Sequence, residues 1–427
     1  MKQESSRAAP RRKGWKIAAI VTAVVAVGGG GVGIATASPW NVPTPPSASP
    51  APAAGTSAGP APTLADAPLQ TPQPPADYTV GPTPTDGAFA VNPATVAAVS
   101  VSGARLVAVE LLPEAGGTPV AGTISADGAR WTATQRLAFN TAYSFSYAVT
   151  DSAGQTRRAT STFSTVAPAN EADASMFPRD GSTVGTGQPL EFTFSEPVTE
   201  RDAVENAITV TSTSGQVGAY YWLSDTKVRY RPEQFWAPNS TITVDLNLFG
   251  VDFGNGMIGN VDKTMTVSTH DTRLAVVDNE TKTMKVYLDG KLDRTFPVTL
   301  GTDEWPSTEG YMVVMENYES TRFTAEFIGL EPGDPAYYPP TVVKHASRLS
   351  NGGAFVHEAL PAAQVALGRT NVSHGCIGMS PEGAKYFYTI FGPGDVVQIL
   401  NTDYGPMYVH DGFGDWNVPW AEWVDQP

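Results

Sequence analysis

From residue 77 onward, the sequence is a succession of short strand patterns separated by turn residues. Residues 106–111, 130–134 and 142–149 are rich in β-branched and aromatic side chains. Short strands that repeat at a spacing of about 8–12 residues are typical of an all-β sandwich. The chain also contains 36 Pro and 41 Gly, which favour strands and turns over long helices. We therefore expect residues 77–168 to form one β-sandwich.

A second series of strand patterns occupies residues 169–270. It comprises residues 190–194, 208–211, 227–231 and 242–246. Neither this segment nor the one before it shows a cluster of His, Asp and Glu side chains. We interpret both as spacer domains rather than catalytic ones.

The sequence pattern of residues 271–402 predicts a mainly β domain with one prominent helix. Strand patterns on both sides of Asp289-Gly290 predict a hairpin with a two-residue turn. Ser380 is a good N-cap, Pro381 suits the first helical position, and apolar residues then recur at helical spacing. A final strand pattern closes the domain.

The N-terminus predicts an exported protein. Basic residues precede an uncharged stretch at residues 17–37, which is long enough to cross a bilayer because a span needs about 20 apolar residues. Small residues at 35–37 also resemble a cleavage site, so residues 1–37 are either a signal peptide or a membrane anchor. Residues 38–76 are rich in Pro and Ala and predict a disordered linker. The rest of the chain is expected outside the cytoplasmic membrane, which it contacts only through this N-terminal segment.

Charge and cysteine content exclude several classes of protein. The formal net charge is −15, which disfavours nucleic acid as a partner because a phosphate backbone needs a basic surface. A single Cys rules out an internal disulfide and any Cys-rich zinc site.

The residues with catalytic potential gather around the lone cysteine, Cys376. Of the five histidines, His357 and His374 flank it along the chain. A thiol is a strong nucleophile as the thiolate, and a nearby imidazole can take its proton. Backbone N–H groups of the Gly-containing loop before the Ser380 helix can stabilise an oxyanion. Two other interpretations stay open: a small buried Cys, and a zinc site that uses His374 and Cys376.

The string Ser373-His374-Gly375-Cys376-Ile377, with Val356-His357 upstream, resembles the L,D-transpeptidase catalytic signature. Residues 306–312 and 394–397 resemble other motifs of that family, and residues 414–420 its actinobacterial C-terminal extension. Actinobacterial members carry one or two immunoglobulin-like domains before the catalytic one. The resemblance covers about residues 80–427. It implies immunoglobulin-like domains at 77–168 and 169–270, a β-rich catalytic domain at 271–402, and an extension at 403–427 packed on it.

The resemblance also implies a mechanism. We expect no metal or cofactor, because the sequence shows no cluster that could supply a third and a fourth zinc ligand. Cys376 would attack the carbonyl between the third residue of a peptidoglycan stem and D-alanine, with His357 as general base. A diaminopimelate side-chain amine of a second stem would then take the acyl group and form a 3→3 crosslink. Ser373, His374 and Gly375 belong to the catalytic motif, and His374, Gly375 and Cys376 would form the oxyanion hole through backbone N–H groups. Carbapenems are expected to acylate Cys376.

The sequence departs from the family pattern at two positions. Gly378 stands where the family commonly has Asn, which removes a polar substrate contact. Glu358 stands where Ser is frequent, and this change is harmless if only the backbone carbonyl orients the base.

A flap, residues 322–350, is expected to cover the site. Tyr338 in the flap and Gly352 and Gly353 beyond it fall where the family contacts substrate. Tyr338 is equally consistent with ordinary packing of the flap.

Several alternatives remain at this stage. Water in place of the amine would give an L,D-carboxypeptidase, which the sequence does not separate from a transpeptidase. A cell-wall cysteine hydrolase would more often place Cys before His, whereas His357 precedes Cys376. A non-catalytic wall-binding protein has no need of either residue.

Overall fold

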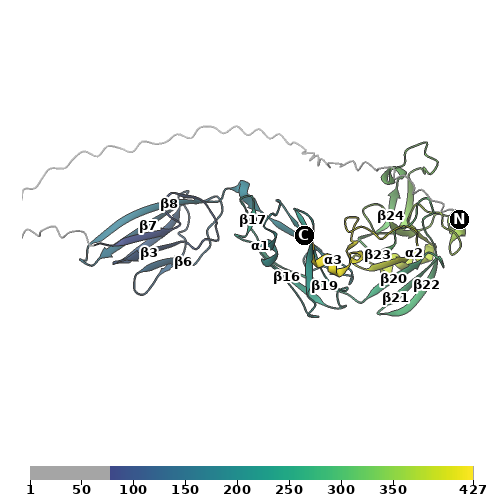
Figure 1. The fold of residues 1–427 in the computed structure, drawn as a ribbon, viewed down its shortest axis with the longest axis horizontal. Helices are drawn as coiled ribbons and strands as arrows, with labels where there is room; N and C mark the ends of the chain where they lie inside the picture. The colour runs from purple at the N-terminus through teal and green to yellow at the C-terminus, as the bar shows by residue number, and fades with distance from the viewer. Residues whose placement is uncertain (1–76, 427) are drawn as a thin grey trace, which may run out of the picture. The chain divides into compact units, whose positions relative to one another are not determined.

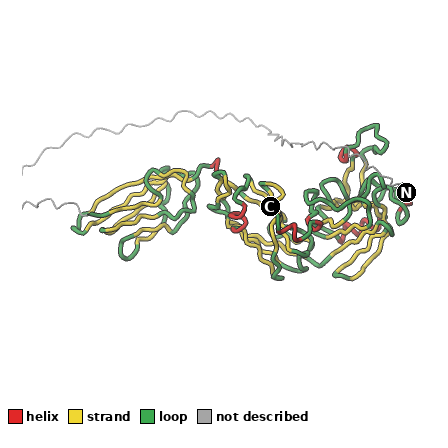
Figure 2. Tube along the Cα trace, viewed as in Figure 1, coloured by secondary structure: helices red, strands yellow, loops and turns green. Residues whose placement is uncertain are grey.

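The computed structural model describes residues 77–426 as two β-sandwiches followed by a third domain built on a nine-stranded sheet (Figure 1). Strands dominate all three, and the few helices are short (Figure 2). The mainly β class expected from the strand patterns is confirmed. The predicted signal or anchor at 1–37 and the predicted linker at 38–76 lie outside the described residues. Within residues 77–426, no helix is both long and apolar enough to cross a bilayer.

The first sandwich pairs a sheet of order β1-β3-β6-β5 with a sheet of order β2-β8-β7-β4. Alternating inward side chains fill the space between the sheets, where the rings of Trp131 and Phe145 meet edge to face at 5.8 Å. Its strands are β1 Thr79–Thr83, β2 Ala88–Val91, β3 Ala98–Ser102, β4 Ala104–Pro113, β5 Gly122–Ile124, β6 Arg130–Ala133, β7 Ala142–Asp151 and β8 Thr156–Thr165.

The second sandwich has sheets of order β10-β12-β15-β14 and β11-β19-β16-β13, with a small sheet β17-β18-β9 at its side. Phe192, Trp236 and Val244 are among the side chains buried between the sheets. Its elements are η1 Pro168–Asn170, β9 Glu171–Ala172, β10 Ala174–Phe177, β11 Thr183–Val184, β12 Leu190–Phe194, α1 Arg201–Asn206, β13 Ile208–Ser212, β14 Gly218–Ser224, β15 Lys227–Pro232, β16 Thr241–Asn247, β17 Asp252–Gly254, β18 Met257–Gly259 and β19 Asp262–Thr269.

The third domain is organised around one sheet of order β23-β28-β20-β21-β22-β27-β26-β25-β24. Its strands are β20 Arg273–Asp278, β21 Thr283–Leu288, β22 Lys291–Thr299, β23 Gly310–Val313, β24 Glu316–Phe323, β25 Thr341–Arg348, β26 Phe355–Glu358, β27 Ile377–Met379 and β28 Val396–Leu400. Its helices are η2 Ala325–Ile328, η3 Gln364–Ala366, α2 Pro381–Ile390, η4 Asp415–Asn417 and α3 Trp420–Val424.

Local sequence explains two elements of this domain. Ser380 caps α2 by accepting the Gly383 N–H at 3.1 Å, and Phe387 on its inner face is fully buried against the sheet. The predicted helix is thus confirmed. The predicted hairpin is confirmed too, because Asp289 and Gly290 both have the positive φ of a tight turn, 49° and 74°.

The neighbourhood of β26 and β27 positions the candidate site. These strands pair in parallel, with His357 opposite Gly378. On the other side of β26, the long hairpin of β24 and β25 carries the flap. One edge of the sheet therefore gathers segments that lie far apart in the sequence.

The C-terminal extension divides between two partners, although we expected it to pack on the third domain. Its first part does contact that domain, since Asn417 Nδ2 donates to Tyr311 O at 2.8 Å. Helix α3 instead lies against β14 of the second sandwich, where Trp423 Nε1 donates to Ala219 O at 2.9 Å. The side chain of Arg231 explains this, because its guanidinium lies over the rings of three C-terminal tryptophans, Trp416, Trp420 and Trp423.

The fully buried carboxyl of Asp395 makes stability depend on pH. Burial raises its pKa from 3.8 to about 8, so the native state binds a proton that the unfolded chain releases. The free energy of unfolding is therefore expected to fall as pH rises from 4 to 8, by at most about 1.4 kcal/mol per pH unit. Asp395→Asn should remove the contribution of this carboxyl and so make the loss of stability smaller, as urea denaturation at both ends of the range will show. Parallel pH dependence of the two proteins would contradict the assignment.

Candidate active site

Cys376 lies immediately before β27, beside the parallel strand β26. Its Sγ contacts the carbonyl oxygen of Gly353 at 3.5 Å. The residue is partly exposed and lines a cavity. Burial raises the pKa of the thiol to about 11. The resting sulfur is therefore a protonated thiol at neutral pH.

His357 lies on β26 and lines the same cavity wall as Cys376. Its Nδ1 is 2.8 Å from the carbonyl oxygen of Glu358, so the proton sits on Nδ1 and the other ring nitrogen can accept one. Burial lowers the pKa of the imidazole below 6.5. No hydrogen bond joins the two side chains in the described part of the chain. The resting pair is therefore a thiol and a neutral imidazole that line the same cavity.

The turn before Cys376 is held by two hydroxyl groups. Ser373 Oγ donates to the Cys376 carbonyl at 2.6 Å and accepts the Gly375 N–H at 3.2 Å. Ser307 Oγ donates to the Gly375 carbonyl at 2.8 Å, and Gly375 has a φ of 110° that strongly favours glycine. The Gly375 N–H, expected in the oxyanion hole, is thus engaged inside the turn.

His374 points its ring at the flap. Its Nε2 lies 3.0 Å from Ala336 O, and its ring packs between Trp305 and Tyr338 at centroid distances of 5.7 Å and 5.3 Å. Burial raises the pKa of Tyr338 to about 12, so this phenol stays neutral. The side chain of His374 therefore anchors the flap over the sulfur.

Gly352 and Gly353 form the turn that faces Cys376 from the β25–β26 connection. Gly353 supplies the carbonyl next to the sulfur and has a φ of 96°. A Cβ atom at Gly353 would lie 2.9 Å from the ring of Phe327 in the flap. Glycine is required here by both conformation and space.

Two cavities, of about 210 Å³ and 220 Å³, meet at the sulfur. The first is lined by Arg322 and Arg348, whereas the second has mainly apolar walls and is lined by His357. Four side chains line both: Phe323, Tyr338, His374 and Cys376. The sulfur is therefore accessible from two sides that differ in charge.

The two unusual positions of the motif have structural explanations. Gly378 lines the second cavity, and a Cβ atom there would lie 2.8 Å from Thr299 Cγ2 and 3.2 Å from Ala359 Cβ. The carboxylate of Glu358 pairs with His345 Nδ1 at 3.2 Å, while its backbone carbonyl orients His357. The Glu358 side chain is thus occupied outside the cavity.

Several residues at the site carry no signal in the sequence. Phe323 packs edge-on against the His357 ring at 5.2 Å, and Ser307 holds the turn from a distant segment. Both lie inside segments that the sequence singled out, the flap at 322–350 and the motif at 306–312, but no pattern marked either one as a site residue. As for zinc, no group of three or more His, Cys, Asp or Glu side chains in residues 77–426 could hold a metal ion.

Comparison with known proteins matches two family models to the chain. Residues 88–252 match a bacterial Ig domain, and residues 272–399 match the L,D-transpeptidase catalytic domain. L,D-transpeptidase 2 of Mycobacterium tuberculosis is 37% identical over 341 residues, which cover 79% of this chain and 82% of that protein.

Two further relatives are more distant. L,D-transpeptidase 5 of Mycobacterium tuberculosis is 30% identical and covers 73% of this chain and 69% of its own length. A solved L,D-transpeptidase in complex with imipenem is 28% identical, covers 53% of this chain and 97% of its own, and has a TM-score of 0.47.

The protonated state of the resting thiol can be tested by alkylation. Because the thiolate is the reactive form, the rate of Cys376 alkylation by iodoacetamide should rise continuously up to about pH 11. Mass spectrometry reports this residue alone, since the chain has one Cys. A plateau that begins at or below pH 9, the ordinary thiol value, would contradict the assignment.

The close contact at Gly378 predicts that a substitution at Thr299 will compensate for one at Gly378. Gly378→Asn should destabilise the protein by about 1–3 kcal/mol through overpacking against Thr299. Thr299→Ser removes the obstructing methyl but keeps the hydroxyl that donates to Thr370 O at 2.9 Å, so the double variant should recover stability. Thermal unfolding of the two single variants and the double variant will measure this, and equal or additive losses in the double variant would contradict it.

Proposed function

This chain belongs to the L,D-transpeptidase family, and from that premise we propose that it forms 3→3 crosslinks between peptidoglycan stems. The observation that supports this best is the meeting of two cavities of different character at one sulfur. A transfer reaction needs a donor and an acceptor at the same atom, whereas hydrolysis needs only the donor and water. The site thus suits an acyl transferase, because the donor and the acceptor can each reach the sulfur through a cavity of its own.

In the first half-reaction, Cys376 Sγ attacks the carbonyl carbon between the third stem residue and D-alanine. His357 accepts the thiol proton as the S–C bond forms, and the backbone N–H of Cys376 stabilises the oxyanion. The C–N bond then breaks, and His357 returns the proton to the amine of the departing D-alanine. A thioester on Cys376 remains.

In the second half-reaction, the side-chain amine of diaminopimelate in another stem attacks the thioester. His357 takes a proton from the amine, the new amide forms, and the thiol is released and reprotonated. The catalyst returns to its resting state with no net change. One D-alanine is released for each crosslink.

We assign the two cavities from the position of His357. The base must reach both the leaving D-alanine and the incoming amine, so these groups use the second cavity, which His357 lines. The acyl part of the donor then occupies the first cavity, where Arg322 and Arg348 complement its carboxylates. We further propose that residues 1–37 carry the protein across the cytoplasmic membrane, where this substrate is found.

The nucleophile is tested with meropenem, because a carbapenem presents a strained acyl group to it. Intact-mass spectrometry of the purified protein should show one stable adduct at Cys376, and Cys376→Ala should show none. His357→Gln keeps a side chain of similar size but removes the base, and should slow acylation by about 10²–10⁴-fold. A folded wild-type protein without an adduct would overturn the proposal.

The acceptor is tested with a disaccharide-tetrapeptide that contains diaminopimelate. We expect release of D-alanine together with a dimer whose mass is that of two tetrapeptide units less one alanine. Release of D-alanine with only a tripeptide product would instead identify an L,D-carboxypeptidase. Cys376→Ala serves as the control for both products.

A further inference from the structure

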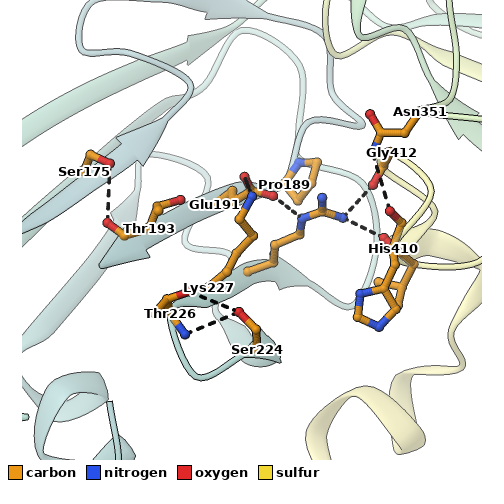
Figure 3. Close-up of polar contacts among 12 residues, drawn as sticks. Ser175, Pro189, Glu191, Thr193, Ser224, Thr226, Lys227, Asn351, His410 and Gly412 are labelled. Carbon is orange, nitrogen blue, oxygen red and sulfur yellow. Dashed lines mark hydrogen bonds and ion pairs between the residues drawn. The ribbon is translucent and has the colours of Figure 1, made fainter. Parts of the chain in front are cut away.

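Arg229 of the second sandwich reaches into the C-terminal extension. It lies on β15, is 5% exposed, and its Nε donates to Glu191 Oε2 at 2.8 Å. Figure 3 shows the sandwich strand that carries Glu191 facing the loop that contains His410 and Gly412. We name residues 409–412 the bridging loop.

The bridging loop is fastened to Arg229 by its backbone. Arg229 NH1 donates to the carbonyls of Val409 at 3.0 Å and Gly412 at 2.8 Å, and to Asp415 Oδ2 at 2.9 Å. Asp415 is fully buried, so this ion pair lies away from solvent. A guanidinium that bridges two carbonyls and a carboxylate fixes the loop in one geometry.

The other side of the bridging loop holds the turn at the candidate active site. Asp411 Oδ1 accepts the Gly352 N–H at 2.5 Å. Asn351 Nδ2 donates to His410 O at 3.4 Å (Figure 3). Gly352 leads directly to Gly353, whose carbonyl oxygen contacts Cys376 Sγ at 3.5 Å. A continuous series of contacts therefore joins Arg229 to the sulfur.

We propose that Arg229 and Asp411 are positioning residues for Cys376. Arg229 fixes the bridging loop, Asp411 holds the Gly352-Gly353 turn, and the turn sets the position of the carbonyl beside the sulfur. The second sandwich thus completes the geometry of the active site rather than only spacing it from the membrane. This inference rests on the proposed function for its catalytic consequence.

The chain offers a matched control for each residue. Lys227 lies on the same strand as Arg229 and also pairs with Glu191, at 2.9 Å. Within residues 77–426, its ammonium makes no hydrogen bond to the bridging loop. Lys227→Gln and Arg229→Gln therefore both remove a cation beside Glu191, but only the second releases the loop. Asp411→Asn keeps an oxygen that can accept the Gly352 N–H, whereas Asp411→Ala removes it.

The experiment measures the time course of meropenem acylation by intact mass. Arg229→Gln and Asp411→Ala should each lower the acylation rate constant by about tenfold. This is less than the loss of about 10²-fold in rate that a 1 Å displacement of a reacting group can cause. The final fraction acylated should stay at the wild-type level, because a merely destabilised protein would lose amplitude rather than rate. Lys227→Gln and Asp411→Asn should stay within about twofold of wild type.

Combining Arg229→Gln with Asp411→Ala tests whether the two residues act in series. The double variant should be no slower than the slower single variant, since either change already releases the turn. The inference would be overturned if Arg229→Gln were acylated at the wild-type rate, or if Lys227→Gln were slowed as much as Arg229→Gln. A lower final fraction acylated with an unchanged rate constant would overturn it as well.

Alkylation of Cys376 by iodoacetamide separates this inference from the proposed function. It requires no transpeptidase activity, so it remains informative if meropenem fails to acylate the wild-type protein. Arg229→Gln and Asp411→Ala should then react faster than wild type at neutral pH, because the Gly353 carbonyl no longer favours the protonated thiol. Unchanged alkylation in both variants would overturn the inference.

Discussion

The parallel pairing of β26 and β27 is the constraint on which the candidate site depends. It sets His357 opposite Gly378 and therefore brings the imidazole next to the strand that follows Cys376. Parallel strands require a long connection, and here residues 359–376 supply it together with the turn that holds the nucleophile. The side chains of His357 and Cys376 each contact a backbone carbonyl, that of Glu358 and that of Gly353, rather than each other. A neutral thiol and a neutral imidazole can then coexist at one site.

The same sheet edge explains how distant segments control access. The flap leaves the sheet between β24 and β25 and returns to cover the sulfur, where His374 holds it through Ala336 O. Beyond the flap, the Gly352-Gly353 turn faces the sulfur and is fastened to the C-terminal extension. Cys376 therefore faces two connections, the flap and the Gly352-Gly353 turn, each anchored in a different part of the chain.

Local patterns in the sequence predicted the elements that local forces determine. The Ser380 cap, the Asp289-Gly290 turn and the alternating strands depend on residues a few positions apart, and each is present. The roles proposed for Cys376 and His357 came from a motif and remain predictions. The sequence did not predict the contacts of Phe323 with His357 or of Arg229 with the bridging loop, because they join segments more than 30 residues apart.

The packing of α3 shows the same limit. Three tryptophans in the C-terminal extension are visible in the sequence, but nothing local indicates that Arg231 of the second sandwich lies over them. The family resemblance implied that the extension packs on the preceding domain. Tertiary contact instead divides it between two domains.

The raised pKa of Cys376 has a consequence for the lifetime of the protein. Oxidants attack the thiolate rather than the thiol, and successive oxidation of a cysteine to its sulfinic and sulfonic acids is irreversible in most proteins. The chain has no second cysteine that could rescue a sulfenic acid as an internal disulfide. Keeping the sulfur protonated until a substrate arrives therefore protects its only thiol from damage that the chain has no means to repair.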